Sequence, residues 1–87
     1  MIRPPPSVPD SELLARFARH RDEAAFELLV WRYARLVGGV CRRTAGDHHA
    51  AEDAAQAAFL VLARRADRLH DPAALPGWLA RVAYRCA

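Results

Sequence analysis

Lysine is missing from this 87-residue sequence, and all 13 basic residues are arginines. A GC-rich genome alone produces such a bias, yet arginine is also better suited than lysine to bidentate phosphate contacts and to stacking on bases. The sequence also lacks a run of about eighteen apolar residues that could span a membrane. Its proline-rich start has no apolar signal-peptide core. We therefore expect a cytoplasmic protein that makes no membrane contact.

Cysteine and histidine are too few and too scattered for a metal site. The two cysteines are Cys41 and Cys86, and the four histidines form neither a CxxC nor an HxxxH spacing with them. We therefore predict reduced, structural thiols, no bound metal and no cofactor.

Glycine is sparse, and the six prolines lie only at the start of the chain and at positions 72 and 76, so the long interval between them favours helix. We predict an all-α fold, a small bundle of four helices in one domain over residues 10–87. A core of this size is marginal unless helices pack closely or a partner covers part of the surface. Residues 1–9 form a proline-rich tail that cannot hold a helix and is expected to be disordered. The expected helices are residues 11–20, a long helix from residue 23 up to the glycine at 46, about 48–66, and 77–85.

Helix ends can be assigned from cap residues. Asp10, Asp22 and Asp47 are each placed as an N-cap, because a short carboxylate accepts from the first free backbone N–H groups. Gly46 is placed to end the long helix in a left-handed conformation. The pair at residues 38–39 interrupts that helix, since each glycine costs about 1 kcal/mol in a helix interior, and predicts a bend or a close helix crossing.

Charge is unevenly distributed along the chain. Residues 1–46 carry eight arginines against five acids, residues 47–63 carry three acids and no arginine, and residues 64–87 carry five arginines against two acids. An acidic segment between two basic ones is typical of a protein that meets a basic protein surface at one place and a polyanion at another. Accidental clustering on solvated helix faces is the competing interpretation.

The acidic segment has its few polar side chains close together on an alanine-rich helix. Glu52 and Gln56 are one turn apart, and Asp53 and Gln56 are three residues apart, so these groups lie on adjoining strips. We interpret them as a contact surface. Phe59 follows Gln56 by three residues and is expected to pack inward, although it could also fill a pocket across an interface.

The last third of the chain is basic. Arg64, Arg65 and Arg68 suit the negative end of the preceding helix dipole, which explains them without any function. Arg81 and Arg85 are one turn apart on one side of the last predicted helix. We expect the inward stripe of this helix to hold Trp78 and Val82, with Leu79 or Cys86 as further members. The helical pattern still continues at Ala87, so we expect this segment to be part of a longer protein.

Three separated motifs resemble one protein family in the right order. The segment DEAAFELLV at residues 22–30, the AED-x-x-Q-x-x-F pattern at residues 51–59, and the WL-x-x-VA pattern at residues 78–83 resemble region two of bacterial sigma factors. The similarity is greatest to the small extracytoplasmic-function group and covers about residues 10–87. The helix-turn-helix domain that reads the minus-thirty-five element in this family is not in the sequence.

The resemblance implies a non-enzymatic transcription initiation factor that binds RNA polymerase core and recognises the promoter minus-ten element as its strands separate. In this family the AED-x-x-Q helix docks on the clamp coiled coil of the largest polymerase subunit, and many members also have an anti-sigma factor as partner. By matching position, the polymerase-binding candidates are Glu52, Asp53, Gln56 and Phe59. The loop before the WL motif, with the helix ends that flank it, holds a flipped-out base of the non-template single strand in this family. The DNA-binding candidates are Arg64, Arg65, Arg68, His70, Asp71, Trp78, Arg81 and Arg85, although Trp78 is expected to be a core anchor more than a stacking surface.

Two other functions are compatible with a small helical domain. A protein-interaction module would bind polymerase or a regulator without touching DNA, and would show no salt-dependent DNA affinity. An enzyme would use Glu52, Asp53 and His48 or His49 as acid, base or ligand. No nucleophile with an adjacent base supports an enzyme, and we predict no catalytic activity.

Overall fold

Four α-helices and two short 3-10 turns make up the structure, a computed structural model that describes residues 7–69 and 71–87. The predicted all-α fold with four helices is confirmed. The elements are α1 (Asp10–His20), α2 (Glu23–Thr44), α3 (His48–Arg65), η1 (Ala66–Arg68), η2 (Pro72–Ala74) and α4 (Leu75–Cys86).

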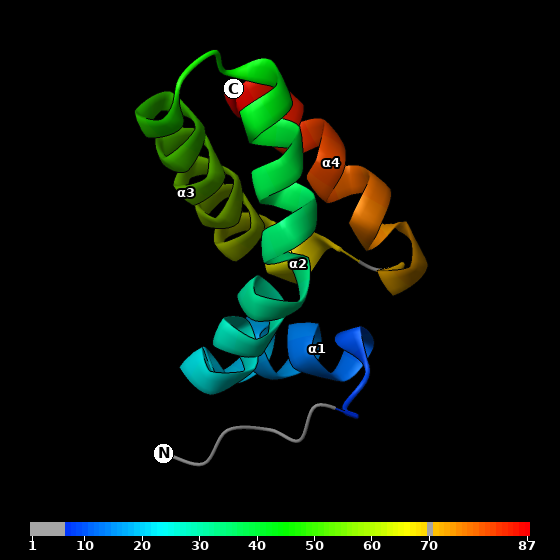
Figure 1. Cartoon of the computed structure of the whole chain (residues 1–87). Helices are drawn as coiled ribbons and strands as arrows, with labels where there is room; N and C mark the ends of the chain where they lie inside the picture. Colours follow the sequence, from blue (N-terminus) through cyan, green and yellow to red (C-terminus); the bar gives the residue numbers. More distant parts are fainter. Residues whose placement is uncertain (1–6, 70) are drawn as a thin grey trace.

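The long helix α2 is the centre of the fold and packs against the other three helices (Figure 1). Helices α3 and α4 lie along its upper part in this view, while α1 crosses its lower end and also contacts η1. The large side chains at the centre are fully buried, and each such leucine contributes about 1.5 to 3 kcal/mol of burial free energy. They are Leu13, Leu29, Leu62, Leu75, Leu79, Val37 and Cys41.

Two of the predicted caps are confirmed, and they fix the turns around α2. The Asp22 carboxylate accepts from the backbone N–H groups of Ala24 and Ala25, and the Asp47 carboxylate accepts from that of Ala50. Gly46 has a φ of +60°, the left-handed conformation that was expected of it. The chain therefore reverses direction tightly between α2 and α3.

The predicted N-cap role of Asp10 is wrong. Helix α1 begins at Asp10 itself, and the carbonyl of Pro9 accepts the first backbone N–H groups, those of Glu12 and Leu13. The Asp10 carboxylate turns instead to α2, where it accepts from Arg32 Nη1 at 2.8 Å and from the Tyr33 hydroxyl. Two strong donors from a neighbouring helix outcompete the local backbone N–H groups for this carboxylate.

The predicted interruption at residues 38–39 is also absent, because α2 runs unbroken through both glycines. Gly38 lines a small hollow with Ala51 and Ala55 of α3, and a side chain added at Gly38 would meet only Arg42 of the same helix. Neither glycine therefore marks a break in α2 or a close approach of another helix.

Helix α4 begins two residues earlier than predicted, at Leu75 instead of residue 77. Pro76 is tolerated because the first turn of a helix needs no donor at that position. The early start buries Leu75, and the inward stripe is Leu75, Leu79 and Ala83. Trp78 and Val82, which were expected to form that stripe, are half-buried at its edges.

One of the two thiols belongs to the core, and the start of the described chain packs against it. Residues 1–6 of the predicted tail lie outside the described residues, and Val8 packs against the core. Cys41 is buried and Cys86 is half-buried, and both are free thiols. Among residues 7–69 and 71–87, no helix has both the length and the apolar character that would let it cross a membrane.

Candidate functional site

The outer face of α3 carries the predicted contact residues. Glu52, Asp53 and Gln56 are all exposed, while Ala54, Ala58 and Leu62 on the opposite side of the same helix are buried. The bundle therefore holds α3 by its alanines and presents its carboxylates to solvent. These three polar side chains are brought together as the sequence pattern indicated.

One of the two carboxylates has a partner inside the protein. Glu52 Oε1 lies 2.8 Å from Nε2 of His48, one turn earlier on α3, and the glutamate side chain remains 60% exposed. An exposed pair of this kind contributes little to stability. Both groups are therefore free to exchange this contact for one with another molecule.

The fourth polymerase-binding candidate from the motif, Phe59, does not belong to this outer face. Phe59 is half-buried and packs against the core, as expected of it. The exposed apolar side chain is its neighbour Leu60, which is 59% exposed. The sequence contained a usable signal, because Leu60 follows Gln56 by four residues and so continues its strip.

Arg64, Arg65 and Arg68 are exposed at the carboxyl end of α3 and in η1. Within the described part of the chain, none of the three pairs with a carboxylate. They leave a concentration of uncompensated positive charge at the end of the bundle where α1 also lies.

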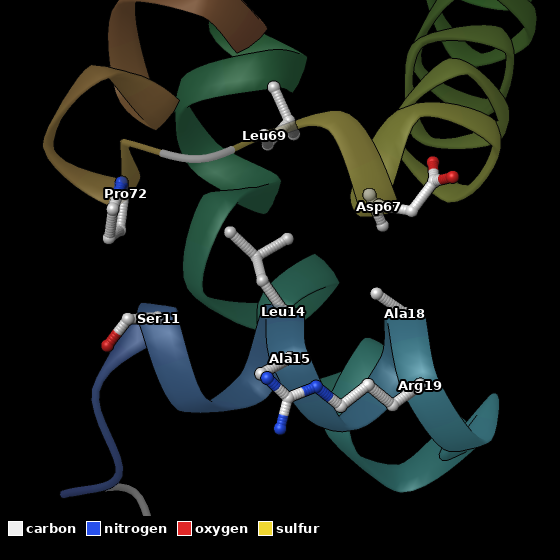
Figure 2. Close-up of a pocket in the computed structure, with 9 residues that line it drawn as sticks. Ser11, Leu14, Ala15, Ala18, Arg19, Asp67, Leu69 and Pro72 are labelled. Atoms are coloured by element: carbon white, nitrogen blue, oxygen red, sulfur yellow. The ribbon is translucent and has the colours of Figure 1, made fainter.

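A pocket of about 470 Å³ opens beside these arginines, between α1 and the segment that follows α3. Figure 2 shows Leu14 and Ala18 pointing from α1 toward this segment, and the Pro72 ring pointing back toward α1. Apolar and polar groups share the lining of the pocket, and the polar ones come from Ser11, Arg19 and Asp67. The lining residues are Ser11, Leu14, Ala15, Ala18, Arg19, Ala66, Asp67, Leu69 and Pro72. The contribution of α1 was missed, because no sequence pattern indicates which helix packs against a loop.

Two further DNA-binding candidates lie near the start of α4, Asp71 just before η2 and Trp78 within α4. His70, another candidate, lies outside the described residues. The Asp71 carboxylate accepts from the backbone N–H of Ala73 at 3.1 Å and so caps η2, although the residue is exposed. Trp78 is half-buried against the core, so its ring is only partly available to a ligand.

Arg81 and Arg85 lie in a different place from the other arginines. They line a shallow groove of about 600 Å³ between the carboxyl ends of α2 and α4. Arg43 adds a third guanidinium to this groove, and Tyr84 adds a ring that is 65% exposed. The groove and the pocket are at opposite ends of the bundle (Figure 1). Arg43 and Tyr84 were missed because the sequence does not show that α2 and α4 end side by side.

The described residues offer no obvious site for a metal ion, since no three histidine, cysteine, aspartate or glutamate side chains among them come together. The polar residues described above lie on three surfaces: an acidic and amide strip on α3, a pocket flanked by arginines, and a basic groove.

Comparison with known proteins assigns the chain to one family. The profile described as Sigma-70 region 2 matches residues 29–87, more than half of the chain. The RNA polymerase sigma-H factor of Pseudomonas aeruginosa is 35% identical over 78 residues, which is 90% of this chain and 40% of that protein. The chain thus spans about two fifths of the length of the curated relative it matches. No solved structure matches it.

Proposed function

Because the chain belongs to the sigma-70 region 2 family, we propose that it acts as part of a transcription initiation factor of the extracytoplasmic-function group. In this role it binds RNA polymerase core in the cytoplasm and recognises the promoter minus-ten element, and it catalyses no reaction. The observation that carries the proposal is the outward-facing strip of Glu52, Asp53 and Gln56 on a helix whose other side is buried.

The polymerase surface is the strip on α3, and its partner is the clamp coiled coil of the largest polymerase subunit. Two carboxylates and an amide on a close-packed helix can accept hydrogen bonds from arginines of a partner, and such charge-assisted bonds are about twice as strong as neutral ones. The rigid backbone of α3 supports this role, since the strip loses little freedom on binding. An anti-sigma factor that covers the same strip would compete with polymerase.

The DNA surface is the arginine-flanked pocket between α1 and the segment after α3. A flipped-out base of the non-template strand would lie between its apolar walls, while Arg64, Arg65 and Arg68 contact the adjacent phosphates. Ser11, Arg19 and Asp67 provide the donors and acceptors at its rim. Apolar walls for the faces of a base and charge for the backbone are what single-strand binding requires.

The polymerase contact is tested by reversing the charge of the strip. The double substitution Glu52→Arg with Asp53→Arg is expected to weaken binding to RNA polymerase core about a hundredfold or more, because like charges at an interface cost several kcal/mol. Fluorescence anisotropy of the end-labelled chain, titrated with purified core enzyme, measures the affinity.

A matched control makes the same change in net charge elsewhere. Glu12→Arg with Glu23→Arg replaces two exposed acids on α1 and α2, and it is expected to bind core enzyme within about twofold of the unchanged chain. Circular dichroism checks that both variants remain helical. Equal affinity for the α3 variant and the control would reject the proposed polymerase surface.

A further inference from the structure

Leu60 stands out among the exposed apolar side chains because of its position. Trp31, Leu60 and Tyr84 are the large apolar residues that the described part of the chain exposes, at 69%, 59% and 65%. A single exposed leucine needs no explanation in itself. Of the three, however, only Leu60 lies on α3, and it follows the acidic strip directly.

Four exposed residues of α3 form one straight row. His49, Asp53, Gln56 and Leu60 are separated by four, three and four residues, and all four are exposed on the side opposite buried Ala58. Alternating three and four residue steps keep side chains in line along a helix. Rows of this spacing are the ones that a helix offers to a second helix packed alongside it.

The residues around Leu60 leave room for such a neighbour. Ala57 and Ala63, one turn before and after it, end in a methyl group, so Leu60 projects above them. Small residues on either side of a projecting leucine let a partner backbone approach closely and bury its side chain. The row therefore has an apolar knob at one end and charge at the other.

We propose that Leu60 is the apolar anchor of a helix-on-helix contact along α3, and that its occupant is a basic helix with an apolar residue two turns from its basic group. The inference rests on the proposed function and adds to it the anchor residue and the register. Asp53 and Leu60 are seven residues apart, or about 10.5 Å along the axis. The partner must present an arginine or lysine and an apolar side chain at that separation.

The charges that border Leu60 restrict the charge pattern of the partner helix. Glu52 and Asp53 lie before Leu60, whereas Arg64 and Arg65 lie after it. A partner whose basic group meets Asp53 must avoid placing a second basic group beyond Leu60, where it would face Arg64. This restriction rejects a uniformly basic helix.

The position of Phe59 on α3 indicates a role that differs from that of Leu60. Its ring packs against the core, so it stabilises the bundle and does not touch the partner. The apolar contribution to binding is thereby assigned to the residue next to the motif phenylalanine, on the outer face.

The test compares truncations of equally exposed apolar residues in the complete chain. Leu60→Ala is expected to weaken binding to RNA polymerase core about tenfold or more, as is usual for a residue that carries much of the binding energy of an interface. Trp31→Ala removes a large exposed apolar side chain on α2, outside the proposed contact surfaces, and it is expected to bind within about twofold of the unchanged chain. Leu60→Met, which keeps the apolar volume, is expected to retain binding.

The outcomes separate this inference from the function on which it rests. Loss of binding in Leu60→Ala, with an unchanged melting temperature and retention in Leu60→Met, supports the anchor. Unchanged binding in Leu60→Ala, together with loss in the α3 charge reversal, overturns the anchor and leaves the polymerase surface standing. Unchanged binding in both overturns both. Equally weakened binding in Leu60→Ala and Trp31→Ala also overturns the anchor, because the effect would not depend on position.

Discussion

At the scale of single residues, Asp10 shows how a tertiary contact replaces a local one. As the first residue of α1 it was a good cap from sequence, and it still lies at the favourable end of the helix dipole. Its carboxylate nevertheless binds Arg32 and Tyr33 across twenty-two and twenty-three residues. Such a choice depends on where α2 passes, which a cap rule cannot include.

The environment of Tyr33 makes the stability of the protein depend on alkaline pH. Burial, and then the hydrogen bond to the Asp10 carboxylate, raises the pKa of Tyr33 from 10.0 to about 12. Below pH 10 the hydroxyl is protonated in both states and the contact contributes fully. Above pH 10 the unfolded chain loses its proton first, so the free energy of unfolding is expected to fall as the pH rises from 10 to 12.

Tyr33→Phe removes this contact and tests the assignment. The variant is expected to be about 1 to 2 kcal/mol less stable at neutral pH, because a hydrogen bond to a carboxylate is lost. It is also expected to lose less stability than the unchanged chain between pH 10 and pH 12. Urea unfolding at several pH values measures both effects, and parallel pH profiles for the two chains would contradict the assignment.

At the scale of elements, the prediction from sequence is most reliable for those helix ends that depend on adjacent residues. The turn between α2 and α3 follows from Gly46 and Asp47, because the left-handed glycine and the capping carboxylate act within a few residues. The start of α4 was placed two residues late, because Pro76 looks like a breaker until burial of Leu75 extends the helix before it. The first residue of α4 is therefore set by the burial of Leu75 in the core and not by the residues next to it in the sequence.

The glycines of α2 and of the turn are expected to respond in opposite directions to alanine. Gly46→Ala should destabilise the protein by about 1 to 2 kcal/mol, because φ is +60° there although the space is open. Gly39→Ala should stabilise α2 by up to about 1 kcal/mol, since the new methyl group meets only the flexible Arg43 side chain at 3.2 Å. Thermal unfolding compares the two, and destabilisation of similar size in both would show that the helical glycine is needed for packing.

At the scale of the whole molecule, the sequence identified only part of the polar residues of the sites and could not group them. Glu52, Asp53 and Gln56 lie on one helix, so helical spacing alone brought them together. The arginines come from η1 and all four helices, and their division between the pocket at one end and the groove at the other depends on how those helices pack. The hydrophobic periodicity of the sequence does not show which distant segments pack against each other.

Because the arginines lie at two separate places, we expect DNA strands of different length to lose affinity in different arginine variants. A minus-ten single strand short enough to occupy only the pocket end should lose affinity in Arg64→Ala with Arg65→Ala and should be unaffected by Arg81→Ala with Arg85→Ala. A longer DNA that reaches both ends should be weakened by both variants. The salt dependence of log affinity should become shallower by about 0.7 for each single-strand phosphate contact removed.

Binding at two salt concentrations provides the measurement for both DNA lengths. Equal loss of short-strand affinity in the two arginine variants would show that the groove shares the site with the pocket. A chain that functions only as a protein-interaction module would show no salt-dependent binding to either DNA.

The hydrogen bonds between Asp10 and α2 affect the shape of the pocket, and this has a consequence for evolution. These hydrogen bonds anchor the first turn of α1, and that turn supplies Ser11 and Leu14 to the pocket wall. Loosening this anchor would therefore alter the width of the opening without replacing any side chain at the DNA surface. Under the proposed function, a lineage could drift toward different promoters through substitutions at Asp10 or Tyr33 alone.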